Sequence, residues 1–299
     1  MRMLRTLVAF GRPHTIIATT VQVLTIFVIV AGRQAGPAAV APLTLALVAC
    51  LSLNVYVVGI NQITDVDIDR VNKPWLPLAG GRLSMAQGRV IVAAAGVLAL
   101  TLALIAGPYL LLTVAPIMLI GTLYSLPPAR LKRRPISAAI SIAFARGVLS
   151  NLGLALHYSQ VFGVRPPLIT LAMMGVFFFG FGLVIAIYKD LPDGKGDALY
   201  KIETFTTSMG PQRVLGLGRA ILSICYGIPI LLALLLLPSG GALFLLLSHL
   251  AIIGLFWLAS LRVDLRSQTS ISGFYMFLWA IFYAEFGVLS LYELTRAIG

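Results

Sequence analysis

Charged residues are scarce in this chain: they make up only 11% of its 299 residues, and only ten residues are acidic. Soluble globular domains carry roughly a quarter charged residues, so this composition excludes an ordinary soluble protein. Apolar and aromatic residues account for 59%, and the mean hydropathy is +0.98, which excludes a disordered chain. The remaining class is a polytopic membrane protein. Because no linker rich in Ser, Pro and Gly divides the sequence, we expect a single membrane domain.

Cysteine is also rare. Cys50 and Cys225 both lie inside apolar runs, where a free cysteine behaves as a small hydrophobic residue. They predict neither a disulfide framework nor a cysteine metal site. The basic segment 1–12 precedes an apolar run without a small-residue cleavage pattern, so we expect the first apolar run to be a retained helix.

Long apolar runs are abundant. A membrane-spanning helix needs about 20 mostly apolar residues, and nine such stretches occur, separated by short polar or Gly/Pro breaks. The sequence therefore predicts an all-α bundle, in two related halves of about four helices plus a ninth. The expected helices cover residues 14–31, 40–61, 89–106, 109–127, 136–157, 168–188, 213–237, 242–261 and 272–294.

The basic residues indicate the orientation of these helices. If successive connections alternate between the two sides, most of the 22 Lys and Arg residues fall on one side. Positive charge marks the cytoplasmic side of membrane proteins. We therefore expect the N-terminus and the long polar loops to be cytoplasmic.

Most of the acidic residues lie in two of these loops, and polar residues there share helical spacing. They are Asn61, Asp65 and Asp69, at every fourth position, and Asp190, Asp193 and Asp197, at intervals of three and four. On a helix each group would lie on one face, where like charges repel unless a cation binds between them. Oxygen ligands of this kind suit Mg²⁺ together with substrate phosphates. The spacing favours a metal-bridged polyphosphate site over two merely hydrated loops.

Basic residues accompany the acidic groups. Arg70 and Lys73 follow the first group, and Lys189, Lys195 and Lys201 surround the second. A third loop on the same side continues from Tyr124 and Ser125 to Arg130, Lys132, Arg133 and Arg134. Arg130 and Lys132 are candidates for neutralising a diphosphate, whereas Arg133 and Arg134 are more typical of topology-setting charge and lipid headgroup contact.

Three composite motifs carry a family resemblance. They read Asn61-Gln-x-x-Asp65-x-Asp67-x-Asp69-Arg70-x-Asn72-Lys73-Pro74, then Tyr124-Ser125-x-Pro127-Pro128-x-Arg130-Leu-Lys132, then Lys189-Asp190-x-Pro192-Asp193-x-x-Gly196-Asp197. The chain resembles the UbiA superfamily of intramembrane prenyltransferases over nearly its whole length. Arg12-Pro13-His14-Thr15 and Phe274-Tyr275-Met-Phe-Leu-Trp279-x-x-Phe282-Tyr283-x-Glu285 look most like the homogentisate phytyl/solanesyl transferase branch.

The resemblance implies helices around a central cavity and transfer of a prenyl group from a prenyl diphosphate to an aromatic acceptor such as homogentisate. It implies that Mg²⁺ bridges the diphosphate to Asn61, Asp65, Asp69, Asp193 and Asp197, with Asp190 fitting the branch. The candidate substrate-binding residues are Arg12, His14, Lys73, Tyr124, Ser125, Arg130, Lys132, Asn151, Lys189 and Lys201. The products of such enzymes belong to quinone or tocopherol synthesis.

Polar residues inside the predicted helices are candidates for orienting the acceptor. Arg146 lies about ten residues inside its helix, too deep for its side chain to extend to the membrane surface, so a functional role is the default hypothesis. Asn151 follows in the same helix. His14 suits either acceptor binding or an interfacial anchor. We expect His157 and His249 to be ordinary helix-end residues, and Glu285 to pair with a buried cation or a polar network.

Aromatic side chains are candidates for shielding an allylic cation through their ring faces. Tyr124 and the run 177–179 offer such rings, although an aromatic run in a membrane helix commonly packs or contacts lipid. Two other functions stay open. An intramembrane terpene cyclase would ionise the same diphosphate without an acceptor. A transporter would use the acidic loops for ions, but transporter ion sites usually lie near the membrane midplane.

Overall fold

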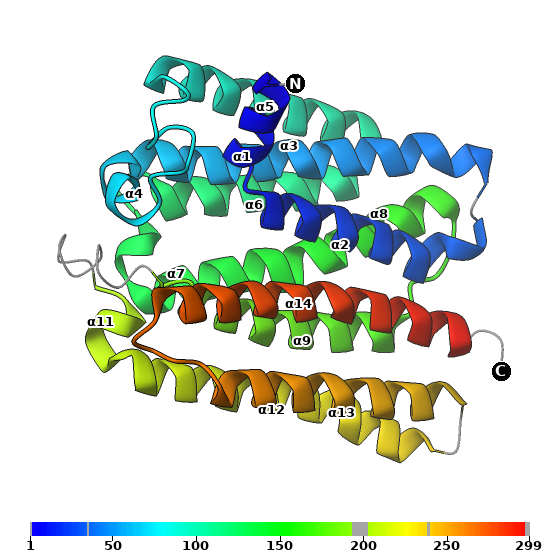
Figure 1. Ribbon diagram of the computed structural model, residues 1–299. Helices are drawn as coiled ribbons and strands as arrows, with labels where there is room; N and C mark the ends of the chain where they lie inside the picture. Colours follow the sequence, from blue (N-terminus) through cyan, green and yellow to red (C-terminus); the bar gives the residue numbers. More distant parts are fainter. Residues whose placement is uncertain (1, 35, 193–202, 238–239, 297–299) are drawn as a thin grey trace. The chain divides into compact units, whose positions relative to one another are not determined.

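The computed structural model describes residues 2–34, 36–192, 203–237 and 240–296, and every regular element in these ranges is helical (Figure 1). Within these ranges nine helical stretches are long and apolar enough to cross a membrane. They are Pro13–Ala31, Pro37–Thr64, Met85–Ala106, Pro108–Ser125, Pro135–Phe162, Leu168–Tyr188, Pro211–Leu236, Gly241–Leu261 and Gln268–Thr295. The predicted all-α fold is confirmed, and the spans agree to within a few residues.

The chain divides into two compact units, and the first comprises residues up to 133 together with 153–165. Within it, α3 packs against α2, α5 and α6, and α5 packs against α6. Its helices are α1 (Arg2–Phe10), α2 (Pro13–Ala31), α3 (Val40–Thr64), α4 (Val66–Asn72), α5 (Met85–Ala106) and α6 (Pro108–Ser125), with short helices η1 (Gly32–Gln34), η2 (Pro37–Ala39) and η3 (Leu131–Arg133).

The second unit comprises residues 134–152, 166–192 and the described residues after 202. Within it, α9 packs against α7, η4, α12 and α14, and α13 packs against α12 and α14. Its elements are α7 (Pro135–Ala143), the π-helical η4 (Phe144–Leu149), the start of α8 (Ser150–Phe162), α9 (Leu168–Tyr188), α11 (Phe205–Met209), α12 (Pro211–Leu236), α13 (Gly240–Leu261) and α14 (Gln268–Arg296). The expected single domain with related halves stays a prediction.

Local sequence explains where several helices begin. Proline occupies the first position of α2, α6, α7 and α12, where its missing N–H has no helical partner to lose. Gly107 (φ 122°) supplies the turn between α5 and α6 that the Gly107-Pro108 pair predicts. At the start of α5 the Ser84 hydroxyl accepts from the Gln87 amide (3.1 Å), and the Gln87 side chain accepts from the Ser84 amide (2.9 Å). This reciprocal cap fixes the first turn of α5.

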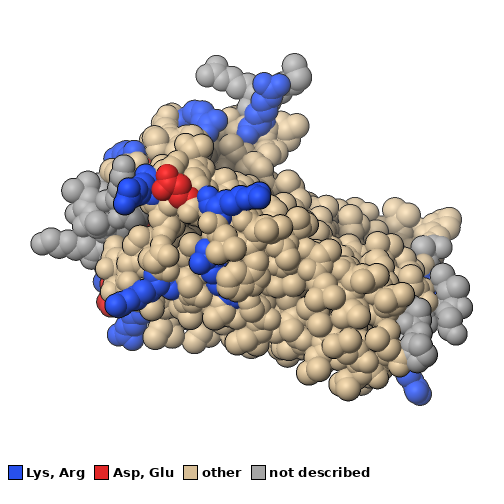
Figure 2. Space-filling view, turned by 60° about the horizontal axis from the view of Figure 1, so that its bottom comes forward, with Lys and Arg blue, Asp and Glu red and all other residues tan. Residues whose placement is uncertain are grey.

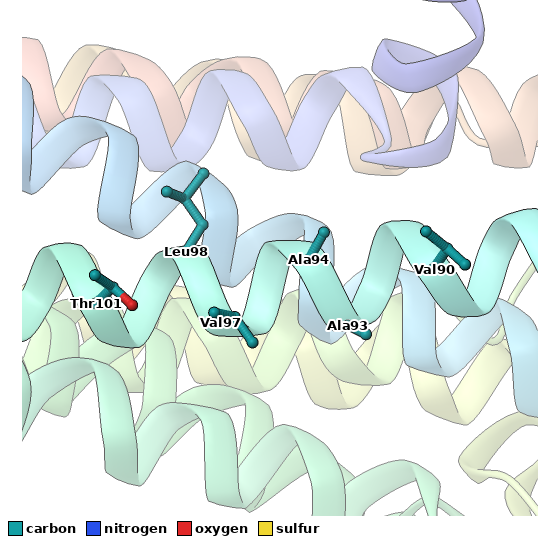
Figure 3. A pocket seen from close by; sticks show the side chains of 6 residues that line it. All are labelled: Val90, Ala93, Ala94, Val97, Leu98 and Thr101. Atoms are coloured by element: carbon teal, nitrogen blue, oxygen red, sulfur yellow. The ribbon is translucent and has the colours of Figure 1, made fainter.

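The outer surface suits a lipid environment. On the face shown in Figure 2, charged side chains are few and uncharged residues form most of the surface. A groove on α5 is lined by side chains from that helix alone, and Figure 3 shows them as Val90, Ala93, Ala94, Val97, Leu98 and Thr101. An exposed apolar surface of this extent on a soluble protein would drive association, whereas lipid tails cover it in a bilayer. The chain is therefore an integral, multi-pass membrane protein.

Candidate active site

The end of α3 contains the first acidic group. α3 ends at Thr64, Asp65 leaves helical backbone angles (φ −116°, ψ 14°), and α4 begins one residue later. The helical stretch that contains Asn61, Asp65 and Asp69 is therefore broken at Asp65. The Thr64 hydroxyl donates to the Asn61 carbonyl (3.0 Å), which competes with the helical hydrogen bond to that carbonyl. The Asp65 amide still donates to the Asn61 backbone carbonyl (3.0 Å), and the Asp69 amide donates to the Asp65 backbone carbonyl (2.8 Å). Asn61, Asp65 and Asp69 therefore still follow one another at intervals of one helical turn.

Two basic side chains from the third loop converge on Asp65. The Lys132 Nζ donates to Asp65 Oδ1 (2.6 Å) and to the Thr64 hydroxyl (2.7 Å). The Arg130 guanidinium lies 3.7 Å from the same carboxylate oxygen. The side chains of Lys132 and Asp65 are 11% and 20% exposed, so solvent screens this pair less than a surface salt bridge. The structure thus brings together predicted residues from two of the three loops.

The remaining carboxylates of the first stretch differ in burial. Asp69 is buried, whereas Asp67 is exposed and pairs with Arg70 (2.8 Å) in the neighbouring turn. Asn61, Asp65 and Asp69 offer an amide oxygen and two carboxylates, which is a donor set that fits Mg²⁺. Among the described residues, no three His, Cys, Asp or Glu side chains come together as a metal site.

Only the start of the second acidic group is described. α9 ends at Tyr188, and residues 189–192 form a turn, so the predicted helical spacing does not begin at Asp190. Asp190 is buried, and Lys189 Nζ lies 3.9 Å from its carboxylate. The Pro192 carbonyl accepts from the Gln268 side chain (2.6 Å), which ties this turn to the start of α14. Asp193, Asp197, Lys195 and Lys201 lie outside the described residues.

The other predicted binding residues lie at helix ends. Lys73 follows α4, and Tyr124 and Ser125 end α6, with Ser125 fully buried. Arg12 (φ 56°) forms the corner before α2, and His14 lies in the first turn of that helix. Their roles stay predictions.

Arg146 lies in the π-helical segment η4, which interrupts the spanning helix between α7 and α8. Single π-helical turns inside α-helices often occur at functional sites. A Cβ atom at Gly147 would lie 2.4 Å from the Phe179 amide nitrogen, so only glycine permits this close approach to α9. Asn151 donates to the Gly147 carbonyl (2.7 Å), which satisfies a backbone group of the segment. This hydrogen bond gives Asn151 a structural role in addition to the predicted role of orienting the acceptor.

The Arg146 guanidinium lies over an aromatic side chain of α14, and two tyrosines flank that side chain. Its central carbon lies 5.5 Å from the centre of the Trp279 ring, a cation–π distance. The Tyr275 and Tyr283 rings flank Trp279, with ring centres 6.4 Å and 5.9 Å from it. These three residues recur at every fourth position, so they share one face of α14. The motif near the C-terminus thus supplies the aromatic side chain that lies against Arg146, the predicted intramembrane cation.

Sequence reasoning missed a buried acid–base pair. His249 Nε2 lies 2.7 Å from Glu285 Oε1, and both side chains are fully buried. The prediction that His249 is a helix-end residue is wrong, because it lies in the middle of α13. The buried partner expected for Glu285 is this histidine. The signal available in the sequence was the ionisable residue inside a predicted membrane helix.

The aromatic run of α9 divides between the interior and the surface. Phe177 and Phe178 are fully buried. The Phe177 ring contacts Tyr226 edge-on (5.0 Å between centres), and the Phe178 ring stacks on Phe286 (4.0 Å). Phe179 lines an outer groove between η4 and α9. These contacts indicate that the aromatic residues 177–179 serve mainly in packing, which the sequence left open as the alternative to shielding an allylic cation.

Comparison with known proteins identifies the family. Residues 22–281 match the UbiA prenyltransferase family. The homogentisate phytyltransferase of Synechocystis sp. is 43% identical over 93% of this chain and 92% of its own length. Homogentisate phytyltransferase 1 of Arabidopsis thaliana is 35% identical over 94% of this chain and 73% of its own length.

A solved structure shares the fold. It is that of a UbiA homologue from Archaeoglobus fulgidus bound to GPP and Mg²⁺, with a TM-score of 0.67 and 17% identity, covering 95% of this chain and 99% of that chain. At this identity the likeness concerns the fold alone. The family match extends over most of the sequence, and it includes the helix ends where Lys132 and Arg130 meet Asp65. The chain therefore belongs to the UbiA prenyltransferase family and is an intramembrane prenyltransferase.

Proposed function

We propose that this prenyltransferase uses a prenyl diphosphate held with Mg²⁺ at the end of α3, and an aromatic acceptor that carries a carboxylate, as homogentisate does. The enzyme transfers the prenyl group to the aromatic ring within the membrane. The observation that carries the proposal is the convergence of Lys132 and Arg130 on Asp65, close in sequence to the buried Asp69. The relatives named homogentisate phytyltransferase support this choice of acceptor.

The diphosphate head needs positive charge around it. Asn61, Asp65 and Asp69, with Asp190, Asp193 and Asp197 from the second group, would hold Mg²⁺. When bound, the metal neutralises the diphosphate and makes it a better leaving group. Lys132 holds the Asp65 carboxylate in one orientation, and Lys132 and Arg130 add positive charge next to the leaving group. Lys73, Lys189 and Lys201 are further candidates for diphosphate contacts, and Tyr124 for shielding the allylic carbon.

The transfer breaks the allylic carbon–oxygen bond, and its electron pair leaves with the diphosphate. A ring carbon of the acceptor then donates an electron pair to the allylic carbon, which forms the new carbon–carbon bond. The ring regains aromaticity by losing the proton of the attacked carbon. If the carboxymethyl carboxylate also leaves as CO₂, the electron pair of the broken carbon–carbon bond passes to the CH₂ carbon, which takes up a proton in place of the one that the ring releases. Exclusion of water protects the allylic cation from hydrolysis, and the apolar spanning helices provide that protection.

Arg146 is the residue that we assign to the acceptor carboxylate. Arg146 is half-buried, and a guanidinium withdrawn from water gains two charge-assisted hydrogen bonds from a carboxylate, which offsets its desolvation. Trp279 offers a flat face beside it, and the Tyr275 and Tyr283 hydroxyl groups provide polar contacts for ring hydroxyls. Arg12 and His14 stay candidates for the same acceptor.

We also propose that the N-terminus and the loops with the acidic groups are cytoplasmic. The excess of Lys and Arg in these connections supports that orientation. A prenyl diphosphate would then enter with its charged head in the cytoplasm and its tail in the bilayer.

Mass spectrometry of products tests the function. Membranes that contain the enzyme receive a panel of prenyl diphosphates with Mg²⁺, each with homogentisate, with a neutral hydroquinone, or without an acceptor. We expect a ring-prenylated product that forms best with homogentisate. A cyclic hydrocarbon formed without an acceptor would overturn the assignment in favour of a cyclase, and efficient use of the neutral hydroquinone alone would overturn the choice of a carboxylate-bearing acceptor.

A further inference from the structure

Helix α1 has an exposed apolar face, although the helix is not one of the membrane-spanning helices. Its nine residues extend about 14 Å, which is too short to cross a bilayer. Met3, Leu4, Leu7 and Val8 lie on one arc of this helix, and they are 61%, 67%, 37% and 40% exposed. In Figure 1, α1 runs across the direction of α3 rather than along it.

The end of α1 contacts α3 through packing and hydrogen bonds. Phe10 is fully buried, and its ring lies so close to Gly59 that an added Cβ would be 2.7 Å away. The Phe10 carbonyl accepts from the Gln62 side chain (2.6 Å), and the Gly11 carbonyl accepts from the Asn54 side chain (3.0 Å). These contacts fix the end of α1 against the last turns of α3, next to Asn61.

The same phenylalanine belongs to an apolar cluster near the acidic group. Phe10 packs in this cluster with Ile60 of α3, Leu78 and Leu83 of the segment after α4, and Val92 of α5. That segment begins directly after Lys73. Because the cluster joins α1 to the backbone on both sides of the first acidic group, the position of α1 affects the support of Asp65 and Asp69.

The charge of the N-terminal segment identifies the surface that α1 contacts. Arg5 is exposed at the edge of the apolar arc. Arg2 and Arg12 belong to the same segment, and the sequence has no acidic residue before Asp65. Short amphipathic helices with basic residues and an exposed apolar face lie in the membrane–water interface and bind best to anionic lipids.

We propose that α1 is an interfacial helix whose apolar arc enters an anionic membrane surface, and that its binding there holds the end of α3 in its active arrangement. Met3, Leu4, Leu7 and Val8 contact acyl chains, and Arg5 contacts anionic headgroups. Lipid composition then regulates the use of prenyl diphosphate. The inference depends on the proposed function only for the activity readout, whereas the position of α1 is tested without turnover.

A fluorescent label on α1 tests its position directly. Val8→Cys is labelled with an environment-sensitive fluorophore in the full-length protein, since the native Cys50 and Cys225 are buried. Val71→Cys on α4 is the matched control, because Val8 and Val71 are 40% and 47% exposed. In nanodiscs with anionic lipid we expect blue-shifted, quencher-protected emission from position 8 and aqueous emission from position 71. Aqueous emission from position 8, or protection that depends on protein concentration in detergent, would overturn the proposal.

Activity in the same nanodiscs tests the link to the acidic group. Leu4→Ser/Leu7→Ser should raise the apparent constants for Mg²⁺ and prenyl diphosphate about tenfold, because both side chains lose apolar contact with lipid. Leu104→Ser on α5 is the control, since Leu104 and Leu4 are both 67% exposed, and it should match the wild type. Arg5→Gln should reduce the stimulation by anionic lipid about fivefold. Wild-type constants in Leu4→Ser/Leu7→Ser, or unchanged lipid dependence in Arg5→Gln, would refute the link.

Discussion

At the residue scale, the Lys132 side chain lies 2.6 Å from the Asp65 carboxylate, the first carboxylate of the acidic group. A carboxylate that shares its charge with two cations is already oriented before substrate arrives, and such preorganisation lowers the cost of binding. The sequence predicted that Arg130 and Lys132 would neutralise a diphosphate. It did not predict that they contact Asp65, because residue spacing within one loop contains no information on how that loop folds back onto another helix.

Lys132→Ala should lower kcat/KM for prenyl diphosphate about 10- to 100-fold, since a charge-assisted contact contributes about 1.5–3 kcal/mol. The neighbouring Arg133→Ala is the matched control, because Arg133 is exposed and is assigned to topology. Steady-state kinetics on the purified enzyme measures both. Equal losses in the two variants would mean that general positive charge, rather than the Lys132 contact, matters.

Arg146→Leu should raise the apparent KM for homogentisate about tenfold or more, with little change for prenyl diphosphate, because only the acceptor carboxylate loses its partner. The preference over a neutral hydroquinone should disappear in the same variant. Arg219→Leu is the matched control, since Arg219 lies 5.7 Å from the Trp257 ring in a similar pair. Unchanged acceptor kinetics in a folded Arg146→Leu enzyme would remove Arg146 from the site.

At the element scale, long apolar runs made the spanning helices predictable, whereas their interruptions depend on tertiary contacts. The break at Asp65 coincides with two hydrogen bonds of the Thr64 hydroxyl group, which donates to the Asn61 carbonyl and accepts from the Lys132 side chain. The π-helical segment coincides with the close packing of Gly147 on α9 and the Asn151 bond to its carbonyl. Hydropathy does not report such contacts, so the sequence located Arg146 without showing what orients it.

Gly147→Ala should destabilise the protein by about 1–3 kcal/mol and weaken acceptor use, because the added methyl group must displace the α9 backbone. Gly175→Ala in α9 is the control: apart from its chain neighbours and the backbone of its own helix, no atom lies within 4 Å of the added Cβ, so the stability should change by less than about 0.5 kcal/mol. Thermal unfolding in detergent compares the two. A tolerated Gly147→Ala would contradict the importance of this close approach.

The buried pair between α13 and α14 should behave as one unit. His249 Nδ1 lies 2.7 Å from the Leu245 carbonyl, so it donates there, and Nε2 lies 2.7 Å from Glu285 Oε1. His249→Leu or Glu285→Leu alone should cost about 3–5 kcal/mol, because each leaves an unpaired buried polar group, and the double variant should recover much of that loss. Stability in detergent would show additive losses if the pair were not coupled.

At the scale of the whole molecule, charged helix ends attached to apolar spanning helices suit a substrate with a charged head and a hydrocarbon tail. Scarce charge and high hydropathy were enough to predict the membrane fold, and the motifs were enough to predict the family. The acceptor was harder to predict, because the recognition that we propose depends on which α14 side chains lie against Arg146, and this becomes evident only when helices distant in sequence pack together.

The dependence of product formation on Mg²⁺ tests the central claim most directly. Purified enzyme with prenyl diphosphate and homogentisate should lose prenylated product when a chelator removes Mg²⁺ and regain it when Mg²⁺ is restored. Asp65→Ala and Asp193→Ala should abolish turnover in folded protein, whereas Asp67→Asn should retain it, because Asp67 is exposed and paired with Arg70. Near-normal turnover without Mg²⁺, or in both alanine variants, would contradict a metal-held diphosphate at the end of α3.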